Sequence, residues 1–163
     1  MRTYFDDFNA DFTCKYCGRF VSARTAVSGV VNRNHCPYCL HSRHVDLFEA
    51  GDRLCACKGL MAPVGLTVKR SRDKYANDGQ GELMLVHRCK ECGDLSINRI
   101  AADDDPVRIM EVFELTPERN ITLWEMCERQ GIQLLTLQDR PLVENRLYGV
   151  KIELSEISQL SSS

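Results

Sequence analysis

Hydrophobic residues in the first hundred positions occur in short runs separated by turn residues. Four runs have strand character, and we expect β-strands at residues 20–23, 29–32, 66–69 and 83–88. The turn-prone residues 77–81 precede the last run, so residues 66–88 are predicted to form a hairpin. The first 102 residues are poor in long periodic runs, which is typical of a small β module.

A helical pattern replaces these short runs after residue 115. Thr116 as N-cap, Pro117 at the first helical position and Gly131 just beyond the end predict a helix between residues 116 and 131. Its apolar side is expected to carry Ile121, Leu123, Trp124 and Cys127. We interpret Cys127 as a small core residue, because the neighbouring glutamates do not favour a reactive thiolate.

Strand character returns beyond this helix. Residues 131–137 and 147–154 are predicted to be strands, and Asp139-Arg140-Pro141 is predicted to be a turn between them. Residues 155–163 form a polar tail that we expect to fray.

The acidic run Asp103-Asp104-Asp105-Pro106 separates the two patterns. It is either a domain boundary or the cap of a helix that starts at Pro106. We place the domains at residues 1–102 and 103–163, and expect the second to pack on the first because it is too short for a large core. Their charges differ: 15 Lys+Arg and 11 Asp+Glu give +4 before the boundary, whereas 6 and 12 give −6 after it.

The composition excludes two broad classes of protein. With 44% hydrophobic and 27% charged residues the chain is neither disordered nor membrane-like, and no apolar run is long enough for a spanning helix. The N-terminal residues MRTYFDDFNADF are acidic and have no apolar segment of a signal peptide, so a cytoplasmic protein is expected.

Nine cysteines distinguish this composition from that of an ordinary cytoplasmic protein. In a reducing compartment, closely spaced cysteine pairs indicate metal thiolates rather than disulfides. Cys14-x-x-Cys17 and Cys36-x-x-Cys39 are separated by 18 residues, which is the spacing of a zinc ribbon. Each pair forms a tight turn that presents two thiolates to one tetrahedral ion, so these four cysteines are predicted to bind one zinc ion.

A second zinc site is indicated by Cys89-x-x-Cys92, with Cys57 as the best third ligand. Three residues remain candidates for the fourth ligand on spacing alone: Cys55, His87 and His44. For His44, Asp46 or a neighbouring carbonyl could orient the ring. The expected fold is therefore a small α+β protein, in which a β module with two zinc ribbons precedes a small unit of one helix and strands.

The segment Arg33-Asn34-His35-Cys36-Pro37-Tyr38-Cys39, with its continuation to Asp46, resembles the signature of the bacterial RNHCP domain family. Matching stretches follow in order, and the similarity spans about residues 12–113: Phe12-Thr13-Cys14-x-x-Cys17-Gly18, Cys57-x-Gly59-Leu60-Met61, His87-Arg88-Cys89-x-x-Cys92-Gly93 and Asn98-Arg99-x-Ala101-x-Asp103-Asp104. The resemblance implies a zinc-binding domain of unknown function and transfers no catalytic mechanism. In the family, positions matching His44 and His87 recur and that of Cys55 is usually not cysteine, which favours a histidine ligand; we assign His44.

The first of three hypotheses is an adaptor without enzymatic activity that binds RNA or the translation or transcription machinery. The densest basic stretch, residues 69–75, ends in an aromatic residue that could stack on a base, although it could equally be a solvated hairpin tip. The candidate phosphate contacts are Lys69, Arg70, Arg72, Lys74, Arg33 and Arg43. For Arg33, support of the first zinc site is the competing role.

The other two hypotheses use different parts of the chain. In the second, the acidic unit 103–163 docks a protein partner, and the apolar residues of that unit either fill its core or form an exposed patch; these are Trp124, Leu134, Leu135 and Leu137. In the third, the chain is a zinc-dependent hydrolase with Glu82, Glu91 or Asp46 as base. Thiolate-rich zinc sites are usually closed, so we expect no enzymatic activity.

Overall fold

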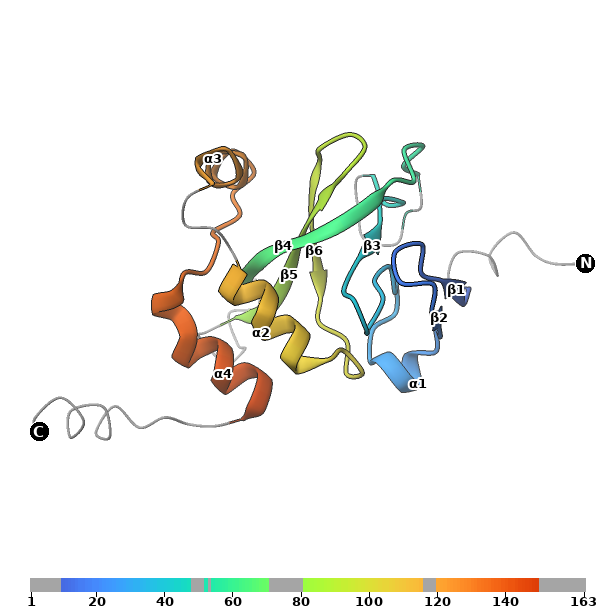
Figure 1. Cartoon of the computed structure of the whole chain (residues 1–163), viewed down its shortest axis with the longest axis horizontal. Coiled ribbons are helices and arrows are strands. Elements are labelled where there is room, and N and C mark those ends of the chain that lie inside the picture. Colours follow the sequence, from blue (N-terminus) through green and yellow to red (C-terminus); the bar gives the residue numbers. More distant parts are fainter. Residues whose placement is uncertain (1–9, 48–51, 53, 71–80, 116–119, 150–163) are drawn as a thin grey trace, which may run out of the picture.

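The computed structural model describes residues 10–47, 52, 54–70, 81–115 and 120–149. Figure 1 shows a central sheet with β1 and β2 at one end of the long axis and α3 and α4 at the other. The elements are β1 (Phe12–Thr13), β2 (Phe20–Val21), α1 (Thr25–Ser28), β3 (Ser42–Arg43), β4 (Leu60–Lys69), β5 (Glu82–Cys89), β6 (Leu95–Arg99), α2 (Pro106–Leu115), α3 (Ile121–Arg129), the 3-10 helix η1 (Leu137–Asp139) and α4 (Arg140–Tyr148).

Two antiparallel sheets organise the described residues. β1 pairs with β2, and the larger sheet has the order β3-β4-β5-β6. β4 and β5 pair from Met61 opposite Cys89 to Lys69 opposite Glu82, which confirms the predicted hairpin, whose turn at 71–80 lies outside the described residues. The register shifts between Pro63 and Gly65, as expected where proline removes a donor from the ladder.

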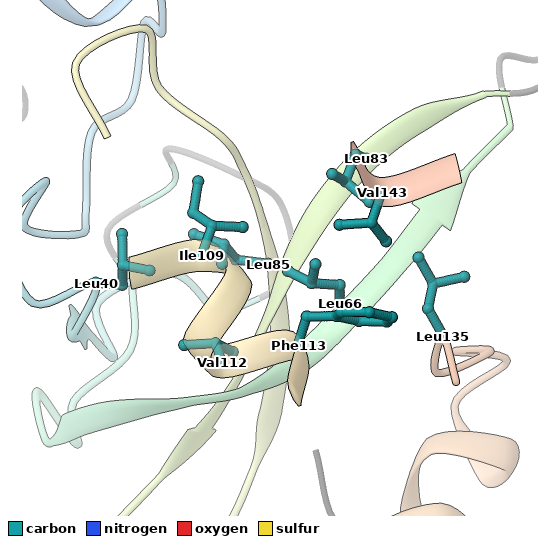
Figure 2. Packing of buried hydrophobic residues seen from close by; sticks show 9 residues of the cluster. All are labelled: Leu40, Leu66, Leu83, Leu85, Ile109, Val112, Phe113, Leu135 and Val143. Atoms are coloured by element: carbon teal, nitrogen blue, oxygen red, sulfur yellow. The ribbon is translucent and has the colours of Figure 1, made fainter. Parts of the chain in front are cut away.

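The main hydrophobic core lies between the large sheet and the helices that cover one of its faces. Figure 2 shows Phe113 of α2 packed among side chains from both sides of residue 102. The buried cluster comprises Leu40, Leu66, Leu83, Leu85, Ile109, Val112, Phe113, Leu135 and Val143. Because the same core draws on β4, β5, α2 and α4, it joins the basic and acidic halves of the chain.

A second buried cluster accounts for the continuous apolar run of β5. Side chains alternate between the faces of a strand, so Leu85 joins the main core and Val86 points away from it. Val86 packs instead with Leu123 and Cys127 of α3 and with Leu134. Burial on both faces explains why β5 lacks the alternation of a half-exposed strand.

Helix α3 confirms the predicted helix but begins later than expected. Asn120 caps it by accepting a hydrogen bond from the Leu123 amide at 3.1 Å, whereas the predicted cap Thr116 lies outside the described residues. Gln130 and Gly131 end the helix, with Gly131 at φ 70°. Its buried residues are Leu123 and Cys127; Trp124 is half-buried, and Ile121 is 69% exposed, contrary to expectation.

The two strands predicted after α3 are wrong. Residues 131–137 make only one isolated bridge, between Leu134 and Thr67 of β4. The segment expected to begin a strand at residue 147 belongs to α4, and its part after residue 149 lies outside the described residues. Pro141 in the first turn of α4 and Gly149 at φ 69° just after its last residue are ordinary helix boundary signals. The apolar residues on either side suggested strands instead. Leu134 and Leu135 are buried, but Leu137 is 47% exposed.

In the first half of the chain, two further predicted strands differ from the structure. The predicted strand at 20–23 is limited to Phe20–Val21. The predicted strand at 29–32 is wrong, because Gly29 ends α1 in the left-handed conformation and the Ser28 carbonyl accepts from the Ala102 amide. The alternative role of the acidic run, as the start of a helix at Pro106, is confirmed by α2.

None of the described helices is both long and apolar enough to cross a membrane.

Candidate metal centres

The first cluster brings together the four cysteines of the predicted zinc ribbon. The sulfur atoms of Cys14, Cys17, Cys36 and Cys39 all lie within 4.8 Å of one another. Cys14 Sγ is 3.5 Å from Cys39 Sγ, and Cys17 Sγ is 3.6 Å from Cys36 Sγ. Four ligands at a Zn–S distance of about 2.3 Å in a tetrahedron are about 3.8 Å apart, so these spacings suit one zinc ion.

A repeated backbone turn positions three of the cysteine pairs, and we call each Cys-x-x-Cys turn a knuckle. In each knuckle the amide of the first cysteine donates to the carbonyl five residues later, and the residue four places on donates back. That fourth residue has a positive φ: 76° at Gly18, 63° at Leu40 and 81° at Gly93. Leucine rarely adopts this conformation, and Leu40 is held there by its burial in the main core.

The second cluster contains His44, Cys57, Cys89 and Cys92, again within 4.8 Å of one another. Cys57 Sγ lies 3.7 Å from Cys89 Sγ, and His44 Nδ1 lies 3.2 Å from Cys92 Sγ. β3 leads directly into His44, whose amide donates to the Gly59 carbonyl at 2.9 Å and so aligns the histidine with the Cys57 loop. Three thiolates and one imidazole form a common structural zinc set, and the two clusters together suit two zinc ions.

The structure separates His44 from the other candidates for the fourth ligand. Cys55 is buried but does not belong to either cluster. His87 uses both ring nitrogens elsewhere: Nε2 donates to the Leu40 carbonyl at 2.6 Å and Nδ1 accepts from Asn98 at 2.9 Å. Burial lowers the pKa of His87 to about 3, which agrees with a neutral imidazole in this position. His87 therefore connects β5 to the second knuckle of the first cluster.

The loop before β4 fits tightly against the second cluster. A Cβ atom built on Gly59 would lie 2.8 Å from Cys89 Sγ and 2.7 Å from the Glu91 side chain. The glutamate side chain can move, but the sulfur is fixed by its place in the cluster. Asp94 lies on the opposite side of the imidazole, with Oδ2 4.0 Å from His44 Nε2, where a carboxylate favours metal binding through Nδ1. Asp46, the orienting residue considered from sequence, accepts from Asn34 Nδ2 at 2.8 Å.

The cysteine thiols differ in how readily they lose a proton. Burial raises the pKa of Cys36 to about 11 and also raises the pKa of Cys39. Burial also disfavours the Cys89 thiolate, but hydrogen bonds from the Cys92 and Glu91 amides outweigh it and lower the pKa of Cys89 to about 7. A metal ion binds thiolates, so the affinity of both centres depends on pH.

Buried polar residues next to the first cluster connect it to the start of α2. Arg33 is 1% exposed; its Nη1 donates to Asp103 Oδ2 at 2.8 Å, and its Nη2 lies 2.8 Å from Asp103 Oδ1. Arg33 Nε also donates to the His35 carbonyl at 3.1 Å. The expectation that Arg33 contacts phosphate is corrected, because its guanidinium is buried and paired. It supports the chain next to the first metal centre instead.

The remaining candidate phosphate contacts are dispersed. Lys69 is the last residue of β4 and lies opposite Glu82, eight residues along the strand from Met61, which pairs with Cys89. Lys69 and Arg70, which follows it, are both exposed. Arg43 is half-buried, with its guanidinium 3.9 Å from the Phe12 ring centre. Arg72 and Lys74 lie outside the described residues. The hairpin cations that the structure describes are thus at the far end of the sheet from the metal centres.

Sequence reasoning missed two features of this region. Asp104, read as part of a boundary, is 7% exposed and lies beside His35 and Arg33. Tyr16 stacks on His41 with 3.5 Å between ring centres. The signal for the first feature was present in the resemblance, which includes both the Arg33–His35 string and the Asp103-Asp104 pair.

The fold and the two clusters define a small α+β protein with two antiparallel sheets and two zinc-binding centres. The RNHCP domain model matches residues 9–110, and the chain therefore belongs to the RNHCP domain family. The matched region contains both clusters and the six strands of the described residues, and it ends within α2. No curated protein and no solved structure is significantly similar to the chain.

Proposed function

We propose that this RNHCP protein is an adaptor without enzymatic activity that binds RNA, or the RNA-containing machinery of translation or transcription. The observation that carries the proposal is the position of exposed lysines on the metal-binding turns themselves. Lys15 and Lys90 lie inside knuckles and Lys58 follows Cys57, and all three are exposed. Rigid turns that present cations suit the recognition of phosphate groups.

The absence of enzymatic activity is supported by the ligand count. Each cluster offers four protein ligand atoms, three or four of them sulfur. Four protein ligands complete a tetrahedral zinc site, which leaves no position for a reactive water molecule. Both centres then have a structural role: they hold the surface turns in place.

Local rather than overall charge has to provide the affinity for RNA. Zinc with four thiolates contributes −2, and zinc with three thiolates and a neutral histidine contributes −1, which reduces the +4 of residues 1–102 to about +1. Long-range attraction of an anion is therefore weak, and binding depends on individual cations.

The test is native mass spectrometry of the full chain isolated from its source under conditions that preserve metals, followed by salt titration of the co-purified complex. Two zinc ions together with RNA or ribosomal or transcription components, released as salt rises, are expected. A chain with two zinc ions that carries no RNA and binds no such component contradicts the proposal.

A protein-interaction role for residues 103–163 is the second candidate. Leu115 at the end of α2 is 75% exposed and Ile121 at the start of α3 is 69% exposed. Apolar side chains at the ends of two successive helices favour a protein contact. Removal of residues 103–163 would also remove part of the main core, so this role is tested by Leu115→Ser and Ile121→Ser in the full chain. Loss of partner binding by these variants, with two zinc ions retained, would favour this role.

A further inference from the structure

Two knuckles of the first metal centre place aromatic rings and cations together on the surface. Tyr16 lies in the first knuckle and is 53% exposed, and Tyr38 lies in the second and is 49% exposed. Each ring contacts the other knuckle or its flank: Tyr16 stacks on His41, and Arg19 lies 4.6 Å above the Tyr38 ring. We call the four residues Tyr16, Arg19, Tyr38 and Lys90 the knuckle surface.

Lys90 extends this surface to the second metal centre. It lies in the Cys89-x-x-Cys92 knuckle, and its Nζ is 5.3 Å from the Tyr16 ring centre. One continuous surface thus joins three of the metal-binding turns. Among the described residues, no carboxylate forms an ion pair with Arg19 or Lys90, so both cations are available to an anionic ligand.

The rings are held in place before any ligand arrives. Tyr16 and His41 stack with an interplanar angle of 7°, and His41 is 7% exposed with Nδ1 3.2 Å from the Cys39 carbonyl. The backbone of Tyr38 lies in the turn between two metal ligands, and Arg19 covers one face of its ring. A preorganised ring loses little conformational entropy when a planar ligand stacks on it.

We infer that the knuckle surface binds single-stranded RNA, with bases stacked on Tyr38 and on the face of Tyr16 opposite His41, and with phosphates held by Arg19 and Lys90. Exposed rings interleaved with cations are the usual means of binding unpaired bases, because every base offers a flat face and every nucleotide a phosphate. This inference rests on the proposed function and names the part of the chain that carries it. The knuckle surface, rather than the hairpin cations Lys69 and Arg70, is then the main contact with RNA.

The position of the surface in the fold agrees with an anionic ligand. β1 and β2, which flank the first knuckle, lie at the opposite end of the long axis from α3 and α4 (Figure 1). The exposed acids Glu125 and Glu128 belong to α3. An approaching strand therefore meets Arg19 and Tyr38 away from these acids, whereas Lys90 has the exposed Glu91 next to it in its own knuckle.

The test measures fluorescence anisotropy of a labelled oligouridine RNA with the zinc-loaded full chain. Tyr38→Ala is expected to weaken binding about tenfold, since one base stack is lost, whereas Tyr38→Phe keeps the ring and the affinity. Tyr148→Ala is the matched control, because Tyr148 is also 49% exposed but lies at the end of α4. Two bound zinc ions in each variant, counted by native mass spectrometry, show that the centre is intact.

The second part of the test varies the charge of the knuckle surface and the strandedness of the nucleic acid. Arg19→Gln is expected to lower the slope of log affinity against log salt by about one, while Arg129→Gln on α3 leaves it unchanged. An RNA duplex of the same length should bind weakly because its bases are not free to stack. The deoxyuridine strand should bind no more tightly than the RNA.

The outcomes separate this inference from the proposed function. RNA binding that is unchanged in Tyr38→Ala, equal for the duplex, or tighter for DNA overturns the knuckle surface and leaves the adaptor function standing. If the zinc-loaded chain binds neither oligouridine, nor any co-purified RNA, nor any ribosomal or transcription component, both proposals fail. If the chain does not bind RNA, and Tyr38→Ala loses binding to a protein partner, the knuckle surface is a protein-recognition surface instead.

Discussion

The imidazole of His35 lies 2.6 Å from the carboxylate of Asp104, and both side chains are buried. His35 Nε2 donates to Asp104 Oδ2, which also accepts from the Ala101 amide at 2.8 Å. His35 immediately precedes the ligand Cys36, and Asp104 lies just before α2. This contact therefore links the first metal centre to the helix that covers the main core.

Substitution of Asp104 by asparagine is expected to lower the free energy of unfolding by about 2 kcal/mol, because it removes the buried negative charge that accepts from His35, whereas Arg33 keeps its pair with Asp103. Urea unfolding of the zinc-loaded protein measures the change. Asp105→Asn is the control: Asp105 is exposed and caps the Val107 amide, which asparagine also does, so its effect should stay within about 0.5 kcal/mol. Equal stability of the two variants would show that the buried contact is not needed.

The glycine next to the second metal centre gives a prediction about metal content. Gly59→Ala is expected to reduce the bound zinc from two ions to one, since the new methyl group would lie 2.8 Å from Cys89 Sγ. Gly131→Ala is the control, because Gly131 has a backbone constraint, φ 70°, but no atom lies near its Cβ position. It costs about 1 kcal/mol but retains both ions. Native mass spectrometry counts the ions; two ions in Gly59→Ala would contradict the tight fit.

The cysteine spacing and the β4–β5 hairpin could be predicted from the sequence because both depend on local chemistry. A Cys-x-x-Cys turn needs only a few residues, and the runs at 66–69 and 83–88 carry strong strand preferences. The fourth ligand of the second metal centre could not be predicted from local sequence. His44 and Cys92 meet only because β3 and β5 both pair with β4, so spacing alone left Cys55 and His87 equally eligible.

The C-terminal third was harder to predict because apolar spacing there was ambiguous. Leu134 and Leu135 are both buried, in different clusters, so they resemble a strand without forming one. Packing against β4 and β5, which no local pattern reveals, decides their conformation. Asp104 was similarly misread, because an acidic run before proline usually indicates a solvent-exposed boundary.

The choice among the three candidate ligands can be tested by substitution. His44→Ala is expected to leave one zinc ion, whereas Cys55→Ser and His87→Gln keep two, since neither residue belongs to a cluster. His44→Cys should restore the second ion as a site of four thiolates. Absorption of the cobalt-substituted proteins reports the number of sulfur ligands, and unchanged spectra in His44→Cys, or loss of one ion in Cys55→Ser, would exclude His44 as the ligand.

Removal of zinc should unfold the surroundings of the first metal centre more than the main core. Around the first metal centre the buried cluster consists of Val21 and three of the ligands themselves, with Phe12 partly buried against it, so little apolar packing remains once the ion is gone. The main core contains none of the metal ligands. A strong chelator is therefore expected to bring amide exchange in residues 12–32 close to unfolded rates while β4, β5 and α2 stay protected. Hydrogen exchange with mass spectrometry measures this, with zinc-saturated chelator as the control. Simultaneous loss of protection in both regions would show that the zinc centres hold the whole fold. Unchanged protection in residues 12–32 would show that the first centre does not organise its surroundings.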